Sequence, residues 1–320
     1  MEMSFFHPNT VHHKLYGALP KQERQAVPLR VCAAGVRAEI ELEMGDKLSR
    51  ISGTGEEFAL ARYCSDLPGH EGSLVIMDGG AGDGVLLVDH LLSKDCCARR
   101  VMACIGETFS QLTLSILRLQ DEGIAHCGIV PGKSLIYHPA RNNIRLGSFS
   151  CALPVFALAP KTRPKYYPEF DPDALHRPPE LHLLTLIVHS PGVRVTQEQV
   201  NRVREIIGTE EVPEFLQKLV DVEVSSAVVT LESTWRSWDG YGLSATYSKL
   251  IHMMTEGTDI SMNPWLCGIL SVLENGYAAD PSMRPGVMQL RRLFEQALYT
   301  NGDVESCQRG VDAIARTKPI

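Results

Sequence analysis

The strongest constraint on the fold is a long amphipathic helix that leads directly into a loop and two short strands. The helix is predicted from Arg99 to Gly123, because glycine is a common C-terminal stop. The loop begins near His126, and strands are predicted at Ser134–Tyr137 and Asn143–Leu146. Helical spacing is kept by the apolar residues Val101, Cys104, Ile105, Phe109, Leu112, Ile116 and Leu119.

The loop and the segment after the strands carry a recognisable pattern. The loop reads His126-Cys127-Gly128-Ile129-Val130-Pro131-Gly132-Lys133, and Ser148-Phe149-Ser150 follows the strands. Together they resemble the catalytic loop (H-R-D-x-K-x-x-N) and the metal-binding D-F-G segment of protein kinases. The resemblance implies that Gly128 stands where kinases carry the catalytic Asp, and Val130 where they carry the loop Lys. It also implies that Lys133 stands at the position of the metal-binding Asn and Ser148 at that of the metal-binding Asp.

These replacements predict a protein that does not catalyse phosphoryl transfer. Gly128 has no side chain to orient a hydroxyl nucleophile, a function worth about 10²–10⁴ in rate. Magnesium prefers anionic oxygen ligands, so Ser148 is a poor ligand and the ammonium of Lys133 repels the ion. We therefore expect a pseudokinase with no catalytic residues, no metal and no cofactor. Whether Lys133 holds a nucleotide phosphate without metal is left open.

Further segments match the family in the same order along the chain. They resemble the last N-lobe strand and hinge, the motif that closes the activation segment, the start of the central helix, and the turn before the final helix: Leu74–Gly80 with Asp83–Leu86, Arg177–Glu180, Asp239–Ser244 and Asp280–Pro285. The resemblance implies two structural contacts, one between Glu180 and Arg284 and one from Asp239 to the backbone at His126.

The fold class implied is α+β, a protein kinase-like bilobal fold. A small, reduced, β-rich N-lobe with an N-terminal arm is expected over residues 1–78, and a mainly helical C-lobe over residues 79–320. Periodicity independently predicts helices over Asp239–Met254 and from Val287 to Leu298, and a strand at Ser73–Met77.

The N-terminal third lacks the Gly-rich loop, strand Lys and helix Glu of the family as a convincing set. Gly53-Thr54-Gly55 is interpreted as a turn. Arg30 is placed at the strand-Lys position, with Glu56 or Glu57 opening a helix over Glu56–Cys64. The N-lobe is therefore expected to be degenerate.

An insertion is expected at about 181–236, because Glu180 and Asp239 lie 59 positions apart, far more than in the family. Thr196 and Gln199 fit a capping box, Gly208 ends that helix, and Glu214–Val220 is predicted to return as a second helix. This hairpin either packs on the lobe or forms a surface for a protein partner. The predicted partners are proteins of a larger assembly.

The segment between Ser150 and Pro179, where kinases have a mobile activation segment, contains seven prolines and the pair Tyr166-Tyr167. Proline restricts φ and lowers the entropy of the open chain, so a static loop is expected. Phosphorylation of a tyrosine here is the alternative.

Composition narrows the function classes. The net charge of −7 argues against nucleic acid as a partner. The most apolar run, Leu181 to Val188, is too short to span a membrane. Nine cysteines without a C-x-x-C pattern, and no signal peptide, predict reduced thiols and a cytoplasmic location, within a cytoskeletal or other large complex.

Other functions remain open at this point. An atypical phosphotransferase would have to recruit another acid, such as Asp121 or Glu122, and a nucleotide-binding regulator would work without metal. Gly128–Ser134 is one residue short of a phosphate-binding P-loop. A zinc site is a further alternative, although its candidate ligands lack the paired spacing of known zinc-binding motifs. These candidates are His126, Cys127, Cys96, Cys97 and Cys151.

Overall fold

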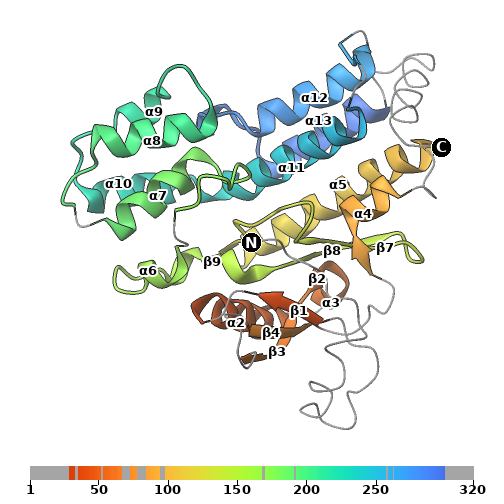
Figure 1. The fold of residues 1–320 in the computed structure, drawn as a ribbon, viewed down its shortest axis with the longest axis horizontal. Coiled ribbons are helices and arrows are strands. Elements are labelled where there is room, and N and C mark those ends of the chain that lie inside the picture. The colour runs from red at the N-terminus through yellow and green to blue at the C-terminus, as the bar shows by residue number, and fades with distance from the viewer. Residues whose placement is uncertain are drawn as a thin grey trace.

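The computed structural model has two lobes, a small one with a three-stranded sheet and a larger, mainly helical one (Figure 1). It describes residues 29–32, 35–51, 53–66, 73–77, 84–93, 98–167, 170–190, 192–256, 259–261 and 263–299. Several predictions fall outside these residues: the N-terminal arm, the hinge at residues 78–83, the side chain of Arg30, and Cys96 with Cys97.

The small lobe is an antiparallel sheet covered by one helix. The strands are β1 (Leu29–Cys32), β3 (Ala61–Asp66) and β4 (Ser73–Met77), in the order β1-β4-β3. The helix is α2 (Val36–Ser49), which follows β1 directly and packs along β3. The strand predicted at Ser73–Met77 is confirmed.

The helix predicted over Glu56–Cys64 is wrong. Only α3 (Thr54–Glu57) forms there, and the chain continues into β2 (Phe58–Ala59) and β3, because residues from Ala61 onward pair with β4. The helix of this lobe is α2 instead. Its inner face is formed by residues four apart, each fully buried: Ile40, Met44 and Leu48.

Close packing of α2 on β3 depends on Gly45. A Cβ atom at this position would lie 2.2 Å from the carbonyl oxygen of Ala61. We expect Gly45→Ala to lower the free energy of unfolding by about 1–3 kcal/mol, because helix and strand must separate. Gly55→Ala is the matched control, since a Cβ there meets no atom within 4 Å. Urea unfolding should therefore separate the two variants, and equal midpoints would contradict the prediction.

The larger lobe holds a four-stranded sheet and a short strand pair. The sheet has the order β2-β8-β7-β5, with β5 (Val85–Leu86), β7 (Leu135–His138) and β8 (Asn143–Gly147), so β2 joins strands of this lobe. β6 (Ile124–Ala125) pairs with β9 (Leu153–Pro154). The two strands predicted after the loop are confirmed as β7 and β8.

Helices form the rest of this lobe. They are α4 (Leu87–Leu92), α5 (Ala98–Asp121), α6 (Arg163–Tyr166), α7 (Pro179–His189), α8 (Gln197–Ile207), α9 (Glu214–Gln217), α10 (Val224–Glu232), α11 (Trp238–Met254), α12 (Pro264–Gly276) and α13 (Val287–Tyr299). Short 3₁₀ turns occupy Phe149–Cys151, Val155–Ala157, Trp235–Ser237 and Pro281–Met283. The helices predicted at α5, α11 and α13 are confirmed. Among the described residues, no helix is long and apolar enough to cross a membrane.

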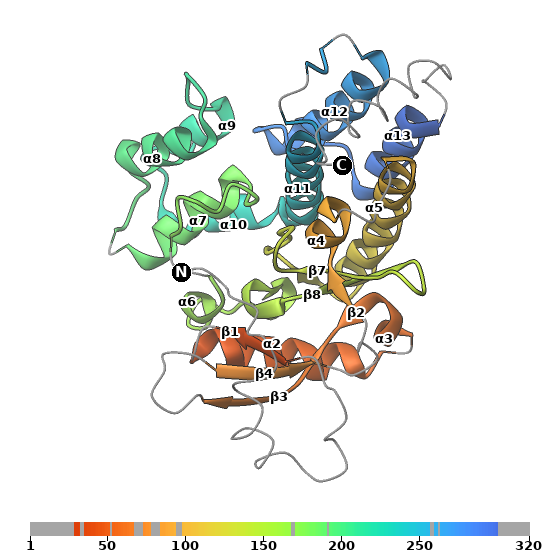
Figure 2. The same cartoon turned by 45° about the vertical axis from the view of Figure 1, so that its right-hand side comes forward.

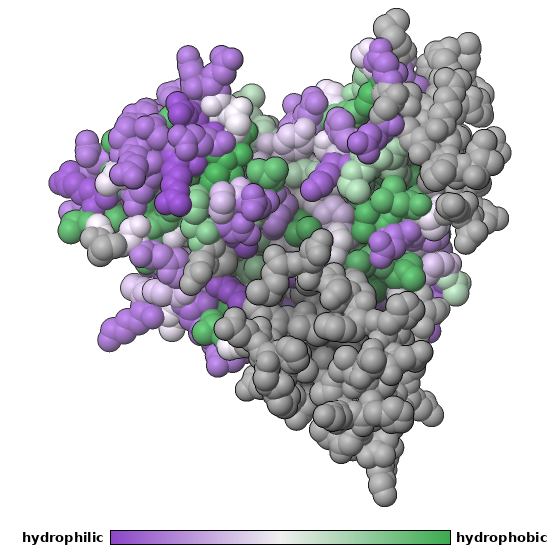
Figure 3. All heavy atoms as spheres, in the orientation of Figure 1, coloured by the Kyte–Doolittle hydropathy of each residue, from purple (hydrophilic) through white to green (hydrophobic). Residues whose placement is uncertain are grey.

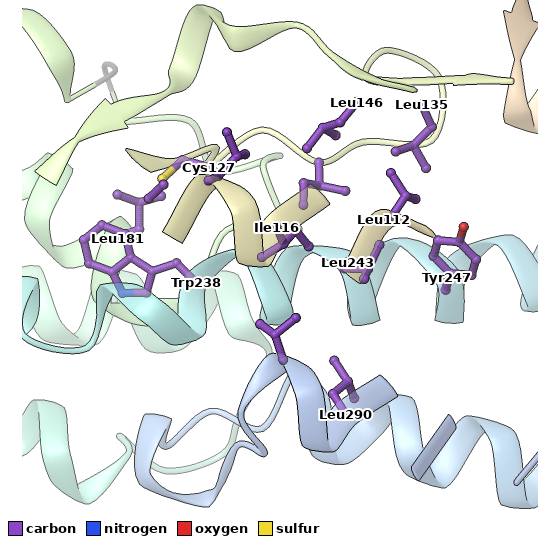
Figure 4. Packing of buried hydrophobic residues seen from close by; sticks show 14 of the residues in the cluster. Leu112, Ile116, Cys127, Leu135, Leu146, Leu181, Trp238, Leu243, Tyr247 and Leu290 are labelled. Atoms are coloured by element: carbon purple, nitrogen blue, oxygen red, sulfur yellow. The ribbon is translucent and has the colours of Figure 1, made fainter. Parts of the chain in front are cut away.

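Helix α11 runs through the centre of the large lobe and organises its core. Figure 4 shows Leu243 and Tyr247 of α11 between α5 and α13, with Trp238 beside Leu181 and Cys127. The hydroxyl of Tyr247 donates to Thr108 at 2.8 Å, so this buried polar group is paired. From Trp238 to Ser248 the helix is buried on nearly all sides, which fits a segment whose apolar residues do not follow one stripe.

The insertion differs in form from the predicted helical hairpin, because it also contains α7 and α10. Helices α7 to α10 stand out from the lobe, with α7 packed on α8 and α10 (Figure 2). The capping box at Thr196 and Gln199 and the left-handed stop at Gly208 are confirmed. The return helix is only one turn long, because the chain reverses at Asp221 (φ 62°), which donates its N–H to the carbonyl of Val195.

Candidate functional site

The loop that follows α5 is fixed from below by α11. The carboxylate of Asp239 accepts the backbone N–H of His126 at 2.8 Å and that of Cys127 at 2.9 Å. Further along, the hydroxyl of Thr246 donates to the carbonyl of Ile129 at 2.8 Å. The expected contact between Asp239 and the backbone at His126 is therefore present, and it is completely buried.

The imidazole of His126 joins this loop to the segment at Ser148. Its Nδ1 accepts the backbone N–H of Gly128 at 3.2 Å, which leaves Nε2 as the donor to the carbonyl of Gly147 at 3.0 Å. The ring also packs edge-on against Phe149, with centroids 4.8 Å apart. His126 and Phe149 are thus core residues that set the backbone positions of two neighbouring segments.

The side chains at the four expected positions provide no carboxylate. Gly128 is buried, and a Cβ there would lie 3.5 Å from the Cβ of Cys151, so space alone does not require glycine. Val130 closes a turn in which its N–H is bound by the hydroxyl of Ser134 at 2.7 Å. Lys133 is partly exposed in the same turn, and Ser148 is buried with a left-handed backbone (φ 69°).

Neither candidate replacement acid lies in this turn. Asp121 is exposed at the end of α5, and the carbonyl of Glu122 accepts the ammonium of Lys47 at 3.2 Å, beside the end of α2. In the part of the chain that the structure describes, no three His, Cys, Asp or Glu residues form a group that could hold a metal ion. The Gly128–Ser134 turn is followed by β7 rather than by the helix that a P-loop requires.

Basic residues gather next to Gly128. Arg177, just before α7, lies with its Nη2 3.8 Å from Sγ of Cys151. Burial, followed by the charge of Arg177, lowers the pKa of His176 to about 3 and that of His182 to about 4. Burial raises the pKa of the Cys127 thiol well above its usual value. Cys127 is therefore a core thiol rather than a nucleophile, and sequence reasoning missed Arg177, His176 and His182 as members of this cluster.

Acid is expected to destabilise the fold through His182, which is fully buried on α7. Its folded pKa of about 4 lies below the usual 6.5, so the unfolded chain binds a proton first as pH falls. Above pH 6.5 the ring is neutral in both states and the fold keeps its full stability. Between about pH 6.5 and 4 the free energy of unfolding therefore falls by about 3 kcal/mol.

Urea unfolding as a function of pH measures this effect. His182→Leu should lose less stability than the parent protein between pH 7 and pH 4.5. His252→Leu is the control, because that ring lies on the exposed side of α11 and bonds only to the carbonyl of Ser248. Parallel pH profiles for the parent protein and the His182 variant would contradict the prediction.

The second expected contact, between Glu180 and Arg284, is present and buried. Two parallel hydrogen bonds of 2.8 Å join the carboxylate to the guanidinium. Arg284 also donates to Ser237 and to the carbonyls of Ala278 and Ala279. This pair links the start of α7 to the turn before α13.

The segment between Ser150 and α7 is held between both lobes. Arg37 of α2 donates to the carbonyls of Ser150, Tyr166 and Tyr167 at 3.0–3.2 Å. On the other side, Glu232 of α10 binds the guanidinium of Arg163 at 2.8 and 2.9 Å. The tyrosine hydroxyls complete the bridge, since Tyr166 donates to Glu43 at 2.6 Å and Tyr167 donates to Glu232 at 2.9 Å.

No family model matches the chain, and no curated protein matches it. Among solved structures, it is similar to three mutants of the PknI kinase domain from Mycobacterium tuberculosis. A double mutant has 13% identity and a TM-score of 0.44, with 84% of each chain covered. A second double mutant and a single mutant have 13% and 14% identity, TM-scores of 0.45, and 87% of each chain covered.

These identities and TM-scores are low, so the description of the fold depends on its own features. A small sheet with one helix lies against a helical lobe, the central helix α11 binds the loop backbone through Asp239, and Glu180 pairs with Arg284. This arrangement is a protein kinase-like bilobal α+β fold.

Proposed function

We propose that this protein is a pseudokinase that acts as a structural subunit of a larger protein assembly. One contrast carries the proposal. Asp239 holds the loop backbone with two hydrogen bonds, while the positions of the proton acceptor and the metal ligands hold Gly128, Lys133 and Ser148. Without a positioned base or anionic metal ligands, the largest contributions to phosphoryl transfer are missing.

The scaffolding role is supported by how the segment before α7 is held. In a regulated kinase this segment must move, whereas here Arg37 and Glu232 connect it to α2 and α10. The bridge makes the two lobes and the insertion one unit. A fixed shape suits a component that positions other proteins, such as those of a cytoplasmic or cytoskeletal complex.

The insertion is the proposed contact surface for a protein partner. Val193 and Val229 are 79% and 63% exposed on it, within a surface that is otherwise largely hydrophilic (Figure 3). Exposed valines among polar side chains supply apolar contacts of the kind found in many protein interfaces.

Nucleotide binding and phosphotransfer are tested on the unmodified protein. We expect no transfer of labelled phosphate from ATP to the chain or to generic substrates. We also expect no rise in the unfolding temperature with adenosine, or with ATP and magnesium beyond ATP alone. Ligand at 100 times its Kd would stabilise the fold by about 2.7 kcal/mol. A magnesium-dependent rise together with transfer would overturn the proposal.

The assembly role is tested with surface variants in the native complex. Val193→Asp combined with Val229→Asp should release the chain from its assembly, seen as a fall in the mass of the native particle. Met283→Asp is the control, because it is equally exposed (72%) but lies before α13. An unchanged particle with the double variant would contradict a partner surface on the insertion.

A further inference from the structure

Arg177 is a buried cation whose hydrogen-bonding capacity is largely unused. Its side chain belongs to a residue that is only 6% exposed, and neither Nε nor Nη1 has an acceptor. The remaining nitrogen, Nη2, contacts only the sulfur of Cys151, which is a weak acceptor. One Nε–H and two Nη1–H hydrogens are therefore unpaired. Buried charged donors are normally paired, so such a group calls for a ligand.

The surroundings of Arg177 are basic, and among the residues that the structure describes no acid pairs with it. His176 precedes Arg177 in the chain, and Lys133 is close enough for its charge to lower the pKa of the His176 ring. The ring of His182, buried on α7, lies close enough to Arg177 for the guanidinium to lower the pKa of His182. The buried acid Asp239 already accepts two backbone N–H groups, and buried Glu180 is paired with Arg284. Asp171, close to His182, is exposed.

The glycine at position 128 contributes to this excess of basic over acidic side chains around Arg177. A Cβ at Gly128 would contact Cys151, the same residue that Arg177 touches. A side-chain carboxylate at this position would add a negative charge next to the guanidinium, but glycine adds none. His176 and Lys133 are partly exposed, so the cluster lies close to the surface of the lobe.

We propose that Arg177, His176 and Lys133 form a binding site for a phosphate group beside Gly128. Phosphate offers several acceptor oxygens and up to two negative charges, which fit three unpaired guanidinium hydrogens and a nearby ammonium better than a two-oxygen carboxylate does. The group is either free inorganic phosphate or a phosphate on a side chain of a partner. This site requires no magnesium and no catalysis, so it is independent of the proposed scaffolding role.

Thermal unfolding of the full chain at constant ionic strength and pH 7.5 provides the first test. Inorganic phosphate and phenyl phosphate are the two probes, with chloride and acetate as controls. Ligand at ten times its Kd should raise the unfolding temperature by about 2–4 °C. A rise with both probes identifies a site open to phosphorylated side chains, and a rise with inorganic phosphate alone identifies a site for the free ion.

Two variants locate the site. Arg177→Met should abolish the phosphate-dependent rise without lowering the unfolding temperature in its absence, because it removes an unpaired buried charge. Lys133→Ala, a partly exposed residue, should fold normally and weaken phosphate binding about 3–10-fold by isothermal titration. The proposal is overturned if phosphate and chloride act alike, if both variants keep the full rise, or if Arg177→Met destabilises the phosphate-free protein strongly.

Discussion

Replacing Arg284 with methionine is expected to lower the free energy of unfolding by about 3–5 kcal/mol, because it leaves the carboxylate of Glu180 buried without its cation. Both side chains are at most 1% exposed, so water cannot take the place of the lost partner. Methionine fills much of the same volume, which keeps the loss of packing small. Only a hydroxyl contact from Thr234 at 3.2 Å would remain on the carboxylate.

Arg291→Met provides the matched control. Arg291 pairs with Glu295 at the same distance of 2.8 Å, but both side chains are about a quarter to a third exposed on one face of α13. A pair of this kind is worth about 0.3–0.5 kcal/mol. Urea unfolding should therefore show a small change for Arg291→Met and a large one for Arg284→Met. Similar losses for the two variants would mean that burial does not determine the contribution of the Glu180 pair.

The sequence was sufficient to predict a structural feature wherever that feature depends on neighbouring residues or on a motif that resembles one of a known family. The stop at Gly123, the capping box at Thr196 and the strand at Ser73–Met77 each depend on a few neighbouring residues, and all three are present. The Glu180–Arg284 pair joins residues 104 positions apart, yet it could be predicted because both residues lie in motifs resembling those of one family.

Prediction failed where long-range contacts decide the outcome. Residues 58–64 contain enough apolar side chains for a helix, but Phe58 and Ala59 pair with β8 and the residues from Ala61 onward pair with β4, so strands form instead. The spacing of Ile40, Met44 and Leu48 could have identified α2, although this helix contains Gly45, a weak helix former. Nothing local to Arg37 indicates that it binds carbonyls 113 to 130 positions away.

The sequence predicted which backbone positions form the candidate site, but it did not predict which charged side chains surround them. The positions of Gly128, Lys133 and Ser148 follow from a motif, whereas the approach of Arg177 to Cys151 depends on how the segment before α7 returns across α11. Gly242 of α11 allows this return, because a Cβ there would lie 3.2 Å from the carbonyl of His176. The same helix supplies Asp239, so α11 positions both sides of the cluster.

Replacing Asp239 is expected to have the second large effect on stability. Asp239→Ala leaves the backbone N–H groups of His126 and Cys127 buried without an acceptor, at about 1–3 kcal/mol for each group. Asp239→Asn keeps one acceptor oxygen and should lose about half as much. Asp259→Asn is the control, since this exposed carboxylate accepts from the neighbouring Ser261, through its N–H at 2.9 Å and through its hydroxyl. Urea unfolding at pH 7.5 should rank the variants in this order.

The pH dependence of Asp239→Asn separates its charge from its hydrogen bonds. Burial raises the pKa of Asp239 to about 6, although the N–H groups of His126 and Cys127 oppose the rise. Between about pH 4 and 6 the folded protein therefore binds a proton that the unfolded chain does not, and this group stabilises the fold as pH falls. His176 and His182 act in the opposite direction. Removing Asp239 should thus make the acid-induced loss of stability steeper than in the parent protein. An unchanged or shallower profile would show that the buried carboxylate stays ionised throughout this range.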